Sequence, residues 1–468
     1  MRIGSSEQSG HSAAAGTAGG WASRRLHFIG IGGAGMSGLA LVCARLGATV
    51  TGSDRAESSY MQRLRRAGLE PHLGHHRANL PQGAEVVVST AIGEDNPELA
   101  LARERGVRPI HRGALLAELC AGKRLIAVAG THGKTTTAAM LVWALRAVGA
   151  DPAFFIGGEV PGLGEGEQPA NAGWGEGEWV IAEADESDAS FLRLGPEIAV
   201  VTNLEMDHHS RWGSLAELRG AFGEFVADAA AVVLPADGSL DDLIEGRNPP
   251  AGQGASDGSR ERPIGGFGAQ APGPADLALA VPGRHNLLNA RAALAAIELA
   301  GFDPDGAAAA LAGFPGVRRR LELKGERNGA RIYDDYAHHP TEVRAALSAL
   351  REKSPTRLLA VFQPHLYSRT RALAADFGAA LALADEVAVL DVYPAREEPV
   401  GRLAGVSGLS VAQEAAERMG GRPVWWLPGA EQAGAALGPR LAPGQILVTI
   451  GAGDVFKLGE ALIAEGDE

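Results

Sequence analysis

Short apolar runs alternate along the chain with longer segments whose apolar residues recur with a helical period. The runs at residues 25–31 and 125–129 each predict a buried strand, and each leads into a glycine-rich turn. A helical pattern follows both turns, and further helical segments lie at residues 59–68 and 96–106. Strands that alternate with helices are typical of parallel sheets, so we expect an α/β fold.

The turn after residues 125–129 has the composition of a phosphate-binding loop. Glycines let backbone N–H groups point inward around a phosphate, Lys134 can reach β- and γ-phosphates, and the Thr135 hydroxyl can hold magnesium. The chain has only five lysines, yet one stands here. The sequence therefore predicts a nucleoside triphosphate site formed by Gly130, Thr131, His132, Gly133, Lys134, Thr135 and Thr136.

Acidic residues follow the next apolar run, at residues 179–183. Ligand clefts lie at the carboxyl ends of parallel strands and magnesium takes oxygen ligands, so we predict that Glu183 is a metal ligand. The acidic residues at 185–188 fit a solvated turn better. His208 lies beyond the following strand and is either a second metal ligand or a structural histidine.

The first strand leads into another glycine-rich turn, in which Gly30, Gly32 and Gly35 fit the pattern GxGxxG. Asp54 ends the next predicted strand. This arrangement is typical of dinucleotide-binding domains, where a diphosphate lies at a helix N-terminus. From these residues alone the turn could hold NAD(P) or FAD, hold another nucleotide diphosphate, or be structural.

Further polar groups stand where a ligand cleft is expected. His285 and Asn289 lie four residues apart at the start of a predicted helix, where they could read an adenine edge or simply cap the helix. In the last third of the chain, polar clusters follow three predicted strands, which indicates a doubly wound sheet facing a cleft. These clusters contain Asp334, Asp335, Tyr336, His338, His339, His365, Tyr367, Ser368, Arg369 and Asp454.

The 468 residues are too many for one core, and ~100–200 residues per domain predicts about three domains. We expect a Rossmann-like domain at residues 22–121, a central P-loop ATPase-like domain with a parallel sheet at 122–315, and a second Rossmann-like domain at 316–468. Residues 1–21 are rich in Gly, Ala and Ser and predict a disordered tail. Residues 241–275 are rich in Gly and Pro, which indicates a loop or reduced subdomain without chemistry.

Composition and charge exclude several classes of function. The net charge is −13, and no lysine-rich tract matches a nucleic-acid footprint. Cys43 and Cys120 are the only cysteines and lie far apart, which is typical of a reducing compartment. No run approaches the ~18 apolar residues of a membrane span, and the N-terminal segment lacks a signal-peptide pattern. We therefore expect a cytoplasmic protein without nucleic-acid or membrane partners.

Eight sequence blocks cover almost the whole chain in order, namely HFIGIGGAGMSGLA, AVAGTHGKTTT, EADESDASFL, TNLEMDHHS, VPGRHNLLNA, DDYAHHPTEV, QPHLYSRT and GAGDV. Each block is moderately specific, and the ordered set is very specific. With them the chain resembles the Mur ligase family, and within it the branch that adds the first amino acid to peptidoglycan precursors. The resemblance implies ATP- and magnesium-dependent ligation of L-alanine to the carboxylate of UDP-N-acetylmuramate through an acyl phosphate.

The resemblance also implies a role for each group of candidate residues. The first glycine turn would hold a UDP-sugar, and the residues implied to bind the substrates are Gly32, Gly33, Ala34, Gly35, Asp54, Ser89, Thr90, Tyr336, His365 and Arg369. The residues implied to bind ATP are the phosphate loop together with His285, Asn289, Arg320 and Asp335. Those implied to hold magnesium are Thr135, Glu183 and His208, and those implied in catalysis are Lys134, Glu183, His208 and His338. The neutral amine would arise through His208, His338 or desolvation alone.

Several alternatives remain open at this point. The nearest is a recycling ligase that attaches a whole tripeptide to the same UDP-sugar, and more distant ones are an NAD-dependent oxidoreductase and a non-catalytic nucleotide-binding subunit. Ligases that add later residues use a carbamylated lysine, but no lysine lies between Lys134 and Lys324, which supports the alanine-adding branch. Residues 235–281 look short for the family, so strands at the edge of the central domain could be missing. The expected state is a monomer or a homodimer.

Overall fold

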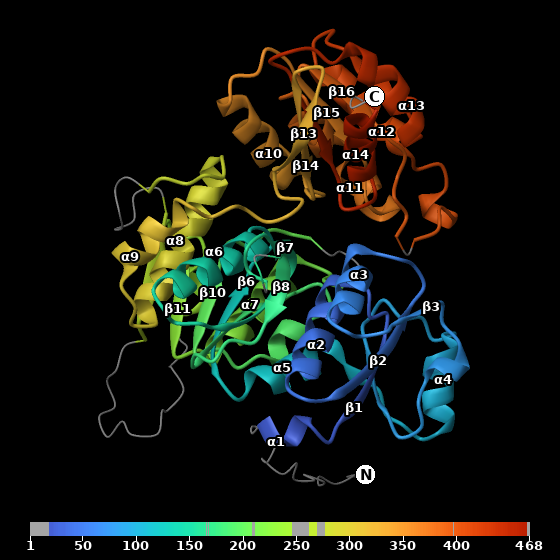
Figure 1. The fold of residues 1–468 in the computed structure, drawn as a ribbon. Coiled ribbons are helices and arrows are strands. Elements are labelled where there is room, and N and C mark those ends of the chain that lie inside the picture. The colour runs from blue at the N-terminus through green and yellow to red at the C-terminus, as the bar shows by residue number, and fades with distance from the viewer. Residues whose placement is uncertain are drawn as a thin grey trace, which may run out of the picture.

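The computed structural model forms three α/β domains, each built on a sheet of its own (Figure 1). The residues that it describes are 18–164, 166, 168–207, 211–245, 262–268, 277–395 and 397–465. The predicted fold class, three α/β domains with parallel sheets, is confirmed. The boundaries after residues 121 and 315 leave one sheet in each unit and stay a proposal. Among the described residues, no helix is both long and apolar enough to cross a bilayer.

The first sheet has five parallel strands in the order β3-β2-β1-β4-β5. Its strands are β1 (Arg25–Ile29), β2 (Thr49–Asp54), β3 (His72–Leu73), β4 (Glu85–Val88) and β5 (Ile110–His111). The helices of this part are α1 (Ala18–Trp21), α2 (Ala34–Arg45), α3 (Ser59–Arg66), α4 (Pro97–Glu104) and α5 (Arg112–Cys120), with a 3₁₀ turn at Arg77–Asn79. The winding reverses between β1 and β4, and ligand clefts of open sheets lie at such points.

The predicted disordered tail is wrong at its C-terminal end. Ala18–Trp21 forms α1, and Trp21 is 6% exposed within the core that continues into the middle domain. The Arg24 guanidinium lies 4.5 Å from the centre of the Trp21 ring. One tryptophan supplies the apolar area that the surrounding small residues lack. The rest of that prediction, residues 1–17, lies outside the described residues.

The middle sheet has seven strands in the order β12-β11-β10-β6-β9-β7-β8, parallel except for the β7–β8 pair. Its strands are β6 (Arg124–Ala129), β7 (Ala153–Val160), β8 (Ala170–Gly173), β9 (Trp179–Glu183), β10 (Ile198–Val201), β11 (Ala231–Pro235) and β12 (Ile264–Phe267). The helices are α6 (Lys134–Ala147), α7 (Leu215–Ala227), α8 (Arg284–Leu299) and α9 (Pro304–Leu311), with 3₁₀ turns at Ser190–Arg193 and Asp241–Leu243.

Of the two alternatives predicted for residues 241–275, a loop or a reduced subdomain, the loop is wrong for β12 (Ile264–Phe267), which is an edge strand paired with β11. Its sequence IGGF has two glycines, so it lacks the apolar pattern of a strand. The edge of the central sheet is therefore not missing at this side. Residues 246–261 and 269–275 of the same segment lie outside the described residues.

The third sheet has the order β13-β14-β18-β15-β16-β17 and is parallel except for the β13–β14 pair. Its strands are β13 (Glu322–Arg327), β14 (Ala330–Asp335), β15 (Leu358–Phe362), β16 (Glu386–Val389), β17 (Val424–Trp426) and β18 (Ile446–Ile450). The helices are α10 (Pro340–Glu352), α11 (Tyr367–Leu381), α12 (Gly408–Arg418), α13 (Ala430–Leu437) and α14 (Phe456–Ala464), with 3₁₀ turns at Gly401–Leu403 and Gly438–Arg440.

Polar contacts join the domains around a shared space. Asn171 of β8 donates from Nδ2 to the carbonyl of Ala34 at the start of α2, over 2.7 Å. Arg369 of α11 donates to Asp207 of the middle domain over 2.8 Å, and both side chains are at least nine-tenths buried. In Figure 1 the C-terminal domain lies above the other two, with α10 and α11 turned toward them.

Candidate active site

A cleft of about 1370 Å³ lies where the three domains meet. Its lining includes the predicted residues Gly32, Gly33, Ala34, Gly35, Thr90, Thr131, Gly133, Lys134, Thr135, Glu183, Arg320, Tyr336, His338, His365 and Arg369. The predicted residues that are described but do not line it are Asp54, Ser89, Gly130, His132, Thr136, His285, Asn289 and Asp335. His208 lies outside the described residues. Segments far apart in sequence thus meet at one cleft.

The phosphate loop turns sharply between the buried strand β6 and α6. Gly130 and Gly133 have φ angles of 128° and 83°, a region that favours glycine. A Cβ on Gly133 would lie 2.4 Å from Oδ1 of Asn289, so α8 packs directly against the loop. α6 begins at Lys134, and the N–H groups of its first turn suit an anion.

Lys134 is held by the loop that it belongs to and by one carboxylate. Its Nζ donates to the carbonyls of Gly130 and Thr131 over 2.6 and 3.2 Å, and to Glu186 Oε1 over 3.0 Å. Burial alone lowers the pKa of Lys134, but the nearby carboxylates, Glu186 first among them, raise it above its usual value. The ammonium group is therefore charged and lies ready for a phosphate.

The prediction that Asp185, Glu186 and Asp188 form a solvated turn is wrong for Glu186 and Asp188, whose side chains are buried, whereas the Asp185 side chain is 34% exposed. Glu186 is 1% exposed, and burial raises its pKa to about 7 in spite of the Lys134 ammonium beside it. Arg112 of α5 donates to Asp185 over 2.8 Å and to Asp188 over 2.9 Å. This acidic turn therefore fastens the first domain to the middle domain beneath the phosphate loop.

Thr135 and Glu183 stand together as the sequence predicts. The Thr135 hydroxyl donates to Glu183 Oε1 over 3.0 Å, and the other carboxylate oxygen accepts the Gly157 N–H over 2.7 Å. A hydroxyl and a carboxylate offer the oxygen ligands that magnesium prefers, so these residues fit the ion. Among the described residues, a separate group of possible ligands, His132, Glu205 and His339, has its ligand atoms within 4.8 Å of one another.

The glycine turn after β1 is held in place by Asp54, which does not line the cleft. Asp54 Oδ2 accepts the N–H of Gly32 over 2.9 Å, and a Cβ on Gly32 would lie 3.0 Å from that oxygen. The carboxylate thus holds the turn instead of facing the cleft. The Ser89 hydroxyl accepts the N–H of Ala91 over 3.4 Å, while Thr90 is exposed and lines the cleft.

His285 and Asn289 lie at the start of α8 beside the phosphate loop. Asn289 is 8% exposed and donates from Nδ2 to Asn286 Oδ1 over 3.4 Å. Burial, with Arg320 nearby, lowers the pKa of His285 to about 4, so its ring is neutral. Both side chains can therefore exchange hydrogen bonds with an uncharged partner next to the loop.

Asp335 and His338 shape the cleft side of the C-terminal domain, together with a second acidic residue, Glu342. Asp335 accepts the N–H groups of Leu321 and Ala337 over 2.7 and 2.8 Å, so it shapes the turn after β14. Burial lowers the pKa of His338 to about 3, and its Nδ1 lies 3.1 Å from the carbonyl oxygen of Tyr336. A carbonyl only accepts, so Nδ1 carries the proton and Nε2 has a free lone pair.

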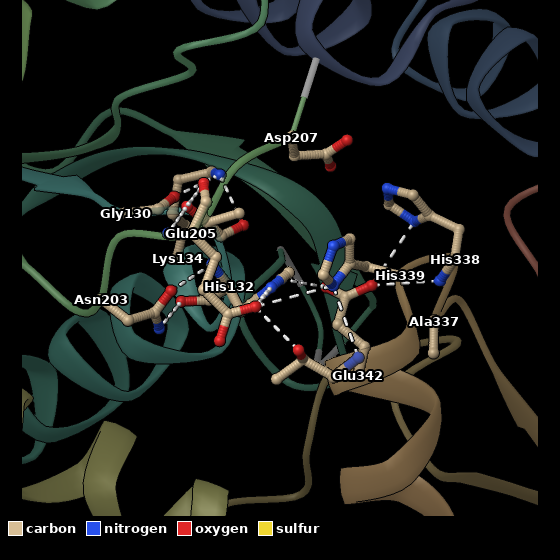
Figure 2. A network of polar contacts seen from close by, with 12 residues as sticks. Gly130, His132, Lys134, Asn203, Glu205, Asp207, Ala337, His338, His339 and Glu342 are labelled. Atoms are coloured by element: carbon tan, nitrogen blue, oxygen red, sulfur yellow. Dashed lines mark hydrogen bonds and ion pairs between the residues drawn. The ribbon is translucent and has the colours of Figure 1, made fainter. Parts of the chain in front are cut away.

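Sequence reasoning missed Glu342, the second acidic group, which lies where the C-terminal domain meets the phosphate loop (Figure 2). The signal that was available is local: Glu342 comes three residues after His339, the N-cap of α10, and so stands where a capping box places its carboxylate. Its Oε2 accepts the N–H of His338 over 3.0 Å, close to where that pattern places it. Its contact with His132 could not be read from the sequence.

Comparisons with known proteins agree along the chain. Three family models match, described as the Mur ligase family catalytic domain (residues 25–124), the Mur ligase middle domain (128–251) and the Mur ligase glutamate ligase domain (319–453). The UDP-N-acetylmuramate–L-alanine ligase of Renibacterium salmoninarum is 45% identical to this chain, over 94% of this chain and 95% of its own length. The UDP-N-acetylmuramate–L-alanine ligase of Rubrobacter xylanophilus is 44% identical, over 94% of this chain and 99% of its own length. The UDP-N-acetylmuramate–alanine ligase structure from Thermotoga maritima is 27% identical with a TM-score of 0.76, covering 94% of this chain and 98% of that one.

Proposed function

This chain belongs to the Mur ligase family, and from that premise we propose that it joins L-alanine to the carboxylate of UDP-N-acetylmuramate, with ATP as the phosphoryl donor, in the cytoplasmic synthesis of peptidoglycan precursors. The observation that carries the proposal is that the first glycine turn, the phosphate loop and the strand ends of the third domain line one cleft. A ligation with three substrates needs all three within reach of one another, and the identity of about 45% favours the alanine-adding branch over the tripeptide ligase.

The first step makes the carboxylate reactive. A carboxylate oxygen of the sugar attacks the γ-phosphorus of ATP, the bond to ADP breaks, and an acyl phosphate forms. Lys134, whose ammonium group is charged, meets the transferred phosphoryl group. Thr135 and Glu183 would hold magnesium, which when bound neutralises charge on the transferring group. Preorganised charge of this kind is the main source of rate enhancement in phosphoryl transfer.

The second step forms the peptide bond. The amine of L-alanine attacks the acyl carbon, the bond to inorganic phosphate breaks, and a proton passes from the amine nitrogen to the departing phosphate. His338 is neutral and, since its pKa is lowered to about 3, only a weak base, so we assign it an orienting role in which Nε2 accepts an amine N–H. Desolvation by the closed cleft would then keep the amine neutral. His208, the other candidate base, lies outside the described residues.

A phosphate-release assay with UDP-N-acetylmuramate and ATP tests this function. L-Alanine should support the fastest release, glycine and L-serine slower release, and the tripeptide none above background. The separate omission of ATP, of magnesium and of the UDP-sugar should each abolish the signal. Release that needs the tripeptide would identify the recycling ligase instead, and the absence of release with any amino acid would refute a ligase of this branch.

A further inference from the structure

The seam between the middle and C-terminal domains carries a polar cluster that the reaction above does not use. His132 of the phosphate loop places Nε2 3.2 Å from Glu205 Oε2 and Nδ1 3.3 Å from Glu342 Oε1. Glu205 also accepts the Thr341 hydroxyl over 2.7 Å. Figure 2 shows the two carboxylates on either side of the His132 ring, one from each domain.

The position of the His132 ring follows the position of the nucleotide loop. Its backbone N–H donates to Asn203 Oδ1 over 2.9 Å, and it lies two residues before Lys134. Each ring nitrogen faces a carboxylate oxygen, which can only accept, so both nitrogens donate and the ring is an imidazolium. The positive charge of the loop at this point is thus held by one carboxylate of its own domain and by Glu342 of the other.

Glu342 has a second set of contacts, which Glu205 lacks. Its Oε2 accepts the backbone N–H of His338 over 3.0 Å and lies 3.6 Å from Nδ1 of that ring. Its Oε1 lies 3.7 Å from the Arg320 guanidinium as well as facing His132. The side chain is 12% exposed, so water competes little for these partners. One carboxylate therefore touches the nucleotide loop, an arginine of the cleft and the histidine proposed to orient the amine.

We propose that Glu342 is a positioning residue that couples the nucleotide loop to the amino-acid end of the cleft. Resting on the function proposed above, it holds His338 and Arg320 of its own domain, and its pairing with His132 fixes where these two residues lie relative to the nucleotide loop. The amino-acid site would thus be completed by closure over a correctly placed nucleotide loop. Such an order protects the acyl phosphate, because the amine site and the closed, water-poor cleft arise together.

The test compares Glu342→Gln with Glu205→Gln, two changes that each remove one carboxylate charge from His132. Glutamine keeps the size of the side chain, and its amide oxygen can still accept one N–H, but it no longer pairs with the cations. Glu342→Gln should raise the KM for L-alanine and lower kcat, with a loss of about ten- to a hundredfold in kcat/KM, the effect of losing a hydrogen bond to a charged group. Glu205→Gln should change the KM for ATP while leaving that for L-alanine within about twofold.

Further variants keep the outcome decisive. Glu342→Asp retains the charge and should bring the KM for L-alanine part of the way back to the wild-type value. A general packing defect would not allow this rescue. The melting temperatures of all three variants show that they fold. Equal effects of Glu342→Gln and Glu205→Gln on the L-alanine KM would overturn the proposal. Stoichiometric zinc retained by the wild type and lost on Glu205→Gln would also overturn it, because a metal would then hold His132. The wild type is assayed in parallel, since failure to use L-alanine at all would refute the proposed function instead.

Discussion

Replacement of Lys134 by alanine separates two consequences that arise from one ammonium group. In the wild type, Nζ bonds two loop carbonyls and pairs with Glu186, which is 1% exposed. Lys134→Ala removes the charge proposed to meet the phosphoryl group, so alanine-dependent ADP formation should fall at least ~10²-fold, as when one preorganised donor is lost. It also leaves the buried Glu186 carboxylate without that cation.

The second consequence is a loss of stability with a defined pH dependence. Removal of one partner of a buried ion pair costs ~3–5 kcal/mol, and at ~2–4 °C per kcal/mol for a domain of this size the melting temperature should fall ~6–20 °C at pH 8. Burial raises the pKa of Glu186 from 4.5 to about 7, so between these values the folded state binds more protons than the unfolded state. Stability from this group is therefore lost as pH rises through 7, and the deficit should be smaller at pH 6.

A double variant distinguishes the two effects. Lys134→Ala combined with Glu186→Gln removes the buried carboxylate charge together with its cation, so it should melt several degrees above Lys134→Ala at pH 8 while staying inactive. Thermal unfolding and a coupled ADP assay measure both, with Glu186→Gln alone as the control that keeps the lysine. Undiminished turnover in Lys134→Ala would refute the role of the loop. A double variant no more stable than the single one would refute the electrostatic explanation.

Three further predictions test other parts of the cleft. Glu183→Gln should raise the magnesium concentration for half-maximal activity, because a carboxylate ligand is lost; an unchanged midpoint in a metal titration would contradict this. Gly133→Ala should weaken ADP binding measured by calorimetry, since its Cβ would lie 2.4 Å from Asn289 Oδ1. Gly149→Ala is the matched control, with a φ of 82° and nothing within 4 Å of the added Cβ, and equal loss in both would argue against the clash. Burial lowers the pKa of His132, but its two carboxylate partners outweigh this and raise it from 6.5 to about 9, so the seam should be intact below pH 6.5 and open as pH rises through 9. Small-angle scattering should show this expansion, and the same expansion in His132→Asn would exclude His132 as its cause.

Much of the fold could be predicted from short segments of the sequence. β9, β15 and β18 coincide with continuous apolar runs because parallel strands are covered on both faces. The exceptions have local reasons as well. β12 has two glycines in four residues, and Trp21 stands alone among small residues, so neither carries an apolar pattern. Trp21 gains its burial, and β12 its pairing with β11, from neighbours that the local sequence does not reveal.

The sequence by itself determined which chemical groups follow which strand, and so it predicted a phosphate loop at Lys134 and an oxygen pair at Thr135 and Glu183. Tertiary structure alone decided which carboxylates lose contact with water and which cations face them. Glu186, expected to be solvated, lies buried beneath Lys134, and Glu342 meets His132 from a distant part of the chain. A side chain's type and spacing are properties of the sequence, whereas its burial and charge partners depend on how the three domains pack, and these set its pKa.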